Sequence, residues 1–141
     1  MLTTDAFLDL DGIASAVAKE LLSGKKVAII NAEKSILSGN KKVIKKKYQT
    51  RLNLQEKENP EHSPYWSRRP DMLVKRVVRG MLPYKKKTAG KTAYKNLRVF
   101  VGIPDAFRQS KPQEIESKNP KEMYVSHITI GELSEMLGYN R

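Results

Sequence analysis

The chain has 141 residues, with 27 lysines and arginines against 15 aspartates and glutamates and no cysteine, so its net charge is +12. This length corresponds to one ordinary domain that can bury a hydrophobic core. The lack of cysteine excludes disulfides and thiolate metal sites, and two histidines are too few for a histidine metal cluster. No segment reaches the roughly 18 consecutive apolar residues of a membrane span. The acidic residues near the N-terminus argue against a signal peptide, so we expect a cytoplasmic protein.

The N-terminal part of the sequence predicts a strand, a helix and a second strand. We expect a short strand at 6–10, a helix that Asp11 caps and Gly24 stops, and a buried strand at 27–30. Apolar residues recur on one face of the helix, namely Ile13, Ala14, Val17, Ala18, Leu21 and Leu22. Because the unbroken run VAII is typical of a strand covered on both faces, the three elements predict a parallel βαβ unit.

The middle of the sequence predicts two longer helices. A turn at 38–40 precedes a helix over 41–54 with its lysines directed outward. Pro70 and Asp71 suit the first turn of a second helix. The predicted apolar face of that helix consists of Met72, Leu73, Val74, Val77, Val78, Met81 and Leu82. Gly80 in this helix costs about 1 kcal/mol relative to alanine, which predicts close packing at that position.

The remaining elements are shorter. In chain order they are a polar loop at 56–64, a helix at 88–96, a buried strand at 97–101, an extended arm at about 103–122 and a strand at 124–128. Thr129 and Glu132 form a capping box, which predicts a last helix carrying Leu133, Met136 and Leu137. We interpret the methionines at helical spacing as core residues.

The positive charge lies almost entirely in the middle segment. Residues 41–100 contain 18 basic and four acidic residues, a net charge of +14, whereas residues 1–40 and 101–141 each have a net charge of −1. A basic stripe of this kind is typical of nucleic-acid binding. Two alternatives to nucleic-acid binding are a solvated lysine surface that serves solubility and a face that binds an anionic membrane. The membrane alternative is weaker, because no helix combines these lysines with a broad apolar face.

The candidate functional site is therefore an RNA-binding face made of cations and aromatic rings. Lysines supply charge without a code for bases, so we expect recognition of backbone and shape. Aromatic rings among the charges permit stacking on unpaired bases, although for Tyr48 and Tyr94 we favour a role in anchoring the helices. The predicted RNA-binding residues are Asn40, Lys41, Lys42, Lys45, Lys46, Lys47, Arg51, Tyr65, Trp66, Arg68, Arg69, Lys75, Arg76, Arg79, Lys85, Lys86, Lys87 and Lys91.

Two other function classes have weaker support. The turn after the expected first strand has a single glycine, which excludes a dinucleotide-binding fingerprint, and no P-loop is present. Four carboxylates could cluster at one sheet edge and bind Mg²⁺ in a nuclease, although caps and surface charges are the commoner roles: Asp5, Asp9, Asp11 and Glu33. We expect structural roles for His62 and His127. A DNA-binding protein is the third hypothesis, which competition between duplex DNA and structured RNA would test.

Four segments occur together in a specific order: INAEK at 30–34, SGN at 38–40, VRGMLP at 78–83 and LRVFVGIP at 97–104. Their order and spacing resemble those of the universal large-subunit ribosomal protein family L13 in its archaeal form. Pro64-Tyr65 and Arg69-Pro70 resemble the archaeal and eukaryotic branch of that family. The resemblance covers nearly the whole chain.

The resemblance implies a single domain over residues 1–141 with a three-layer α/β/α fold and a four-stranded parallel sheet. A basic helical insertion at about 41–96 and a C-terminal extension would complete it. The implied partners are large-subunit rRNA and neighbouring large-subunit proteins, with a role in early subunit assembly and with no catalysis, cofactor, membrane or small-molecule substrate. The family usually has Leu-Gly-Arg before its first helix, whereas residues 10–15 read LDGIAS. No RNA contact is carried over to that loop, since Asp11 would repel phosphate.

Overall fold

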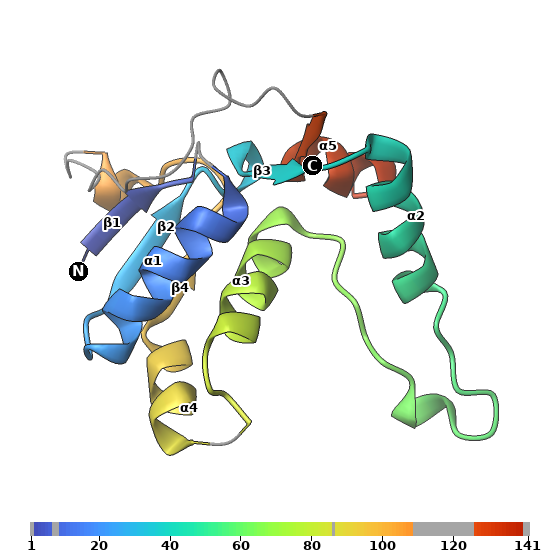
Figure 1. Ribbon diagram of the computed structural model, residues 1–141, viewed down its shortest axis with the longest axis horizontal. Helices are drawn as coiled ribbons and strands as arrows, with labels where there is room; N and C mark the ends of the chain where they lie inside the picture. Colours follow the sequence, from blue (N-terminus) through green and yellow to red (C-terminus); the bar gives the residue numbers. More distant parts are fainter. Residues whose placement is uncertain (1, 7–8, 86, 109–125, 140–141) are drawn as a thin grey trace.

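The computed structural model describes residues 2–6, 9–85, 87–108 and 126–139. Its helices are α1 (Leu10–Leu22), α2 (Lys41–Leu52), α3 (Pro70–Met81), α4 (Thr88–Lys95) and α5 (Ile130–Met136). Its strands are β1 (Leu2–Asp5), β2 (Val27–Ile30), β3 (Ile36–Ser38), β4 (Leu97–Val99) and β5 (His127–Thr129). Short 3-10 turns are η1 (Ala32–Lys34), η2 (Pro60–His62) and η3 (Asp105–Phe107). The fold is mixed α/β (Figure 1).

The main sheet is parallel, with the strand order β1-β2-β4. Thr4 pairs with Ile29, which pairs in turn with Val99. The predicted parallel βαβ unit is therefore confirmed. The expectation of four parallel strands is wrong for the described residues, because the sheet contains three. Strands β3 and β5 instead pair antiparallel with each other, Ile36 opposite Thr129, and form a separate two-stranded sheet.

The first strand and the start of α1 lie earlier than predicted. Strand β1 covers residues 2–5, and Leu10, expected in the strand, is the first residue of α1 and is fully buried. Thr3 and Thr4 are β-branched and buried, which suits a strand in this position. Asp11 is not the cap but lies in the first turn of the helix. Phe7 and Leu8, part of the expected strand, lie outside the described residues.

The core forms where α1 packs against α3, α4 and the parallel sheet. Ile13, Val17 and Leu21 of α1 are buried together with Val74 and Val78 of α3. The apolar face of α3 is narrower than predicted, since Met72 and Met81 are exposed, as is Met136 in α5. The interpretation of these methionines as core residues is therefore wrong. Helix α3 packs mainly against α1 and β4, so the edges of its apolar face remain in solvent.

Close packing occurs at Gly90, for which the sequence predicted nothing, and not at Gly80. A Cβ atom at Gly80 would have no heavy atom within 4 Å, so the predicted close packing there is wrong. A Cβ atom at Gly90 of α4 would lie 2.5 Å from the backbone carbonyl of Pro83. Glycine at position 90 therefore allows α4 to approach the chain that leaves α3.

The side-chain caps of α5, by Thr129, and of α2, by Asn40, are both present, whereas the carboxylate of Glu132 contacts Lys41. The hydroxyl of Thr129 accepts a hydrogen bond of 3.2 Å from the backbone amide of Glu132, as predicted. Asn40 ends the turn at 38–40 and accepts a hydrogen bond of 3.0 Å from the amide of Lys42. These bonds satisfy amide donors that a helix start leaves free. The predicted helices over 41–54 and 88–96 correspond to α2 and α4.

Candidate nucleic-acid interface

Helix α2 is a cationic element with no buried residue. Ile44, Tyr48 and Leu52 lie partly buried against the core, whereas Val43 is 64% exposed. The side chains of Lys42, Lys46 and Lys47 are exposed. Figure 1 shows α2 standing at the edge of the molecule, away from the parallel sheet. Most of its lysines are therefore free to face a polyanion.

One lysine of α2 already has a partner. The ammonium group of Lys41 lies 3.1 Å from a carboxylate oxygen of Glu132 in α5, and both side chains are about half exposed. Exposed pairs of this kind contribute little to stability. The contact nevertheless places α2 beside α5, and it means that Lys41 must exchange a carboxylate for a phosphate in order to bind RNA.

Trp66 joins α2 to α3 through a stack of side chains. The guanidinium carbon of Arg76 lies 3.3 Å from the centroid of the Trp66 ring, and that of Arg51 lies 4.8 Å from it. Arg51 also lies 5.3 Å from the ring of Tyr48. Cation–π contacts hold the planes of the guanidinium groups and leave N–H groups at their edges; Arg76 donates one of these to the backbone carbonyl of Tyr65, at 3.3 Å. Residues from α2, α3 and the intervening segment thus meet at one point.

The charges in this stack repel one another. The pKa of Arg76 is lowered by burial and then by the positive charges of Arg79 and Arg51. The pKa of Tyr48 is raised chiefly by burial, against the opposite effect of the Arg51 charge. Among the described residues, no salt bridge joins Arg51, Arg76 or Arg79 to a carboxylate. A bound anion would relieve this repulsion.

The exposed face of α3 continues the cationic surface. Lys75 lies 5.0 Å from the ring centroid of Tyr94, and Arg79 lies 5.5 Å from that of Tyr84. The two tyrosine rings meet edge to face, with centroids 5.3 Å apart. Tyr94 therefore anchors α4 as we expected, and each ring also supports a cation of α3.

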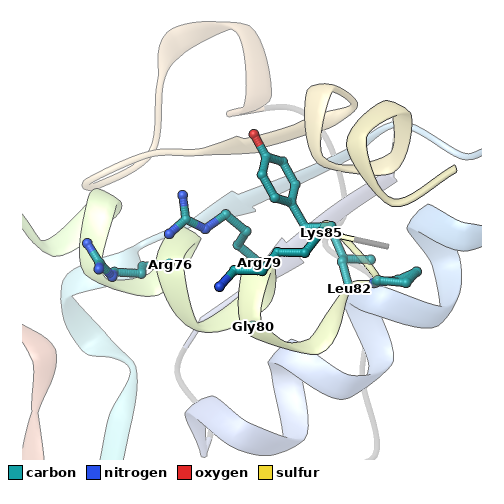
Figure 2. A pocket seen from close by; sticks show the side chains of 7 residues that line it. Arg76, Arg79, Gly80, Leu82 and Lys85 are labelled. Carbon is teal, nitrogen blue, oxygen red and sulfur yellow. The ribbon is translucent and has the colours of Figure 1, made fainter. Parts of the chain in front are cut away.

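The turn from α3 to α4 adds the second group of lysines. Lys85, Lys87 and Lys91 are exposed, and Lys86 lies outside the described residues. A hollow of about 520 Å³ lies between this turn and α3. Its lining consists of Arg76, Arg79, Gly80, Leu82, Pro83, Tyr84 and Lys85. Figure 2 shows Arg76 and Arg79 projecting from α3, with Lys85 extending from the turn that follows.

The segment before α3 is partly engaged in contacts within the protein. Arg69 donates two hydrogen bonds to the carboxylate of Asp71, at 3.1 and 2.8 Å, so its guanidinium is engaged within the protein. The carbonyl of Arg68 accepts a hydrogen bond from the hydroxyl of Ser134, which fixes this segment to α5. Tyr65 is 87% exposed and therefore available for stacking.

Sequence reasoning missed the neutral part of this surface. Gly80, Leu82 and Pro83 line the hollow between α3 and α4, and none was predicted as a site residue. They belong to the segment VRGMLP, which was used to recognise the family and not to locate a site. The predicted cations form two groups, one on α2 and one on α3 and the turn after it, and the Trp66 stack lies between them.

Two of the four carboxylates of the nuclease hypothesis, Asp5 and Glu33, accept hydrogen bonds within the protein. Asn31, which adopts a left-handed conformation with φ 55°, donates a hydrogen bond of 3.2 Å to Asp5. Glu33 accepts a hydrogen bond of 3.0 Å from the amide of Gly102. These bonds tie together the turns that follow β1, β2 and β4. Within the described residues no group of three potential metal-ligating side chains occurs, and none of the described helices has the length and apolarity needed to cross a bilayer.

Comparison with known proteins gives a consistent result. The family described as ribosomal protein L13 matches residues 10–106. The large ribosomal subunit protein uL13 of Methanosphaera stadtmanae is 45% identical over 132 residues, 93% of this chain and 92% of the relative. That of Methanopyrus kandleri is 38% identical over 133 residues, 92% of this chain and 81% of the relative. That of Sulfurisphaera tokodaii is 39% identical over 130 residues, which cover 92% of this chain and 88% of the relative.

Proposed function

The chain belongs to the L13 family of large-subunit ribosomal proteins, and from this premise we propose that it binds large-subunit rRNA through its cationic face. The relatives are ribosomal proteins and not enzymes, and two of the four carboxylates of the nuclease hypothesis accept hydrogen bonds within the protein. The protein acts on the ribosome, in the cytoplasm, as a structural component. It supports an early stage of subunit assembly, when rRNA helices still have to be held together.

The observation that carries this proposal is a set of cations without acidic partners. Arg51 and Arg76 come together from α2 and α3 against Trp66, and the charge of Arg79, which lies against Tyr84, acts on Arg76. No described carboxylate forms a salt bridge with any of the three. Clustering like charges without counterions costs stability, so a monomeric protein gains nothing from it. A phosphate backbone supplies the missing charge and releases its own counterions on binding.

The predicted residues contribute to binding to different degrees. We propose that the cations of α3 and of the Trp66 stack fix the orientation of the RNA, because aromatic rings hold them in place. The exposed lysines of α2 add affinity without fixed geometry. Lys41 and Arg69 contribute less, since each already contacts a carboxylate. Lys86 and the expected arm at 103–122, most of which lies outside the described residues, stay predictions.

The organisation of the chain supports the same function. We propose that residues 1–141 act as one rRNA-binding domain, in which the basic insertion at about 41–96 carries the RNA-binding face and the C-terminal extension contacts RNA or neighbouring large-subunit proteins. The complete three-layer arrangement, which the family resemblance implies, also stays a prediction.

Sedimentation tests the proposal. A cell lysate is separated on a sucrose gradient in Mg²⁺ buffer at moderate salt, and the chain is followed by mass spectrometry. Co-migration with the large subunit supports the proposal, whereas migration as a free 16.1 kDa protein contradicts it.

A second experiment uses purified protein, which is offered large-subunit rRNA in competition with duplex DNA. Preference for the DNA would favour the DNA-binding hypothesis instead. Omission of the protein from subunit reconstitution should stall an early intermediate.

A further inference from the structure

Gly80 has no explanation within the described part of the protein. Gly80 is the penultimate residue of α3. Glycine within a helix costs up to about 1 kcal/mol relative to alanine, and its usual uses are a positive φ or a close approach of another group. Gly80 does not have a positive φ, and a Cβ atom there would meet nothing within 4 Å. Gly90 shows the contrast, because the backbone of Pro83 approaches it closely. The space at Gly80 is therefore open to a partner.

Gly80 lies where two hollows meet. The hollow of about 520 Å³ between α3 and the following turn includes Gly80 in its lining, and we call it the Gly80 hollow. A second hollow of about 240 Å³ is lined by Tyr48, Arg51 and Trp66 among others. It shares Arg76 and Gly80 with the first hollow. A Cβ atom at position 80 would meet nothing within 4 Å, so a side chain there would extend into open space beside the two hollows.

The lining of the Gly80 hollow combines neutral and cationic residues. Leu82, Pro83 and Tyr84 are neutral, and the ring of Tyr84 meets that of Tyr94 edge to face. The cationic part of the lining, here called the rim, has three cations and no carboxylate: Arg76, Arg79 and Lys85, all labelled in Figure 2. The volume lies within the range of small-molecule sites, about 300 to 1,000 Å³. A ligand with one flat ring and one strong negative charge matches this lining.

We propose that the Gly80 hollow binds one unpaired nucleotide of rRNA. The phosphate lies on the rim formed by Arg76, Arg79 and Lys85, and the ribose and base lie against Leu82 and Tyr84. A paired base cannot enter, because its partner strand and its stacked neighbours hold it in the duplex, so the site selects a bulged or looped-out nucleotide. The inference rests on the proposed function and adds the kind of RNA structure that the site recognises.

The test compares two RNA hairpins that differ by one nucleotide. One has a perfect stem, and the other has the same stem with a single-nucleotide bulge. The blocking variant Gly80→Leu adds a bulky side chain to the lining of the Gly80 hollow without removing a charge. The matched control Ser15→Leu adds the same side chain to an exposed position of α1. Wild type and Ser15→Leu should bind the bulged hairpin more tightly than the perfect one. Gly80→Leu should bind the bulged hairpin about tenfold more weakly, since stacking on an aromatic ring is lost.

Two further measurements keep the result interpretable. Gly80→Leu replaces glycine by a better helix former, so its Tm should equal or exceed that of wild type. Gly80→Gln adds a polar side chain of similar size to the same hollow, and its affinity for the bulged hairpin should fall to the same degree. Equal losses would show that the size of the side chain, and not its apolar character, prevents binding. Free adenosine monophosphate tests the source of the nucleotide. If the protein binds adenosine monophosphate as tightly as it binds the bulged hairpin, RNA is not the specific ligand. A lower affinity for adenosine monophosphate supports RNA as the ligand.

The outcomes separate this inference from the proposed function. If wild type binds both hairpins equally, or if Gly80→Leu and Gly80→Gln leave binding of the bulged hairpin unchanged, the nucleotide site is refuted while RNA binding stands. If wild type binds neither hairpin nor large-subunit rRNA, the proposed function itself fails.

Discussion

Helices α2 and α3 are both basic and have the same length of 12 residues, yet the protein holds them in different ways. Helix α3 buries Pro70, Leu73, Val74 and Val78, so its position is fixed by the core. Helix α2 buries no residue and is held by its cap, by partial packing and by the contact of Arg51 with Trp66. The comparison separates two kinds of cationic surface. A packed helix presents charges in fixed positions, whereas a loosely held helix presents charge that can adapt.

This difference has a consequence for binding. Ordering a long cationic side chain costs about 2 kcal/mol of rotamer entropy. Aromatic contacts already order Arg76 and Arg79 before RNA binds, so this cost does not weaken their binding. The exposed lysines of α2 become ordered only on binding, so the cost reduces their contribution to affinity. We therefore expect the α3 cations to determine where the RNA lies, and the α2 lysines to determine mainly how strongly salt weakens the complex.

The largest expected effect contrasts the two helices directly. Val74→Asp places a charge at a fully buried position of α3, where an unpaired carboxylate costs at least roughly 3 kcal/mol, a large share of the stability of a small domain. The matched variant Val43→Asp lies at an exposed position of α2 and should leave the free energy of unfolding nearly unchanged. Urea unfolding of both variants measures this. Equal destabilisation would mean that α2 is anchored as firmly as α3.

A smaller effect is expected at the helix caps. Thr129→Ala removes the cap of α5, which buries Ile130, Leu133 and Ser134, and should lower the free energy of unfolding by about 1 kcal/mol. Asn40→Ala removes the equivalent bond in α2. Because α2 adds little to the core, this change should increase amide hydrogen exchange within α2 and shift the Tm by much less. A Tm loss as large as that of Thr129→Ala would contradict the comparison.

The smallest effect concerns the salt dependence of rRNA binding. Arg79→Met and Lys46→Met each remove one charge, and each should reduce the slope of log affinity against log salt by roughly 0.7 to 0.9. The two variants should differ at fixed salt, where Arg79→Met loses more affinity because Arg79 is held against Tyr84 and Lys46 is exposed. Filter binding at three salt concentrations measures both quantities. Identical losses at fixed salt would show that the aromatic contacts do not orient the charge.

Several features of the fold could be predicted from local sequence alone. The run VAII requires cover on both faces, and the periodicity after Leu10 defines the buried side of α1. The capping box at Thr129 and the short helix α4 are equally local. The concentration of charge between residues 41 and 100 indicated the class of partner before any fold was known.

Other features were decided by partners distant in the sequence. The strand at the start of the chain lies at 2–5 because Thr4 pairs with Ile29, and β5 joins β3 and not the parallel sheet. No local pattern specifies either choice, because pairing depends on which strand edge is left free after the rest has folded.

The site shows the same division. The sequence by itself determined which residues carry charge, since charge is a property of each side chain. Only the tertiary structure decided which of these charges meet: it brings Arg51 and Arg76 to the ring of Trp66, engages Arg69 with Asp71, and leaves Gly80 open while Gly90 is closely packed. The physical reason is that a binding surface depends on distances between side chains, and the packing of α1, α3 and α4 sets those distances.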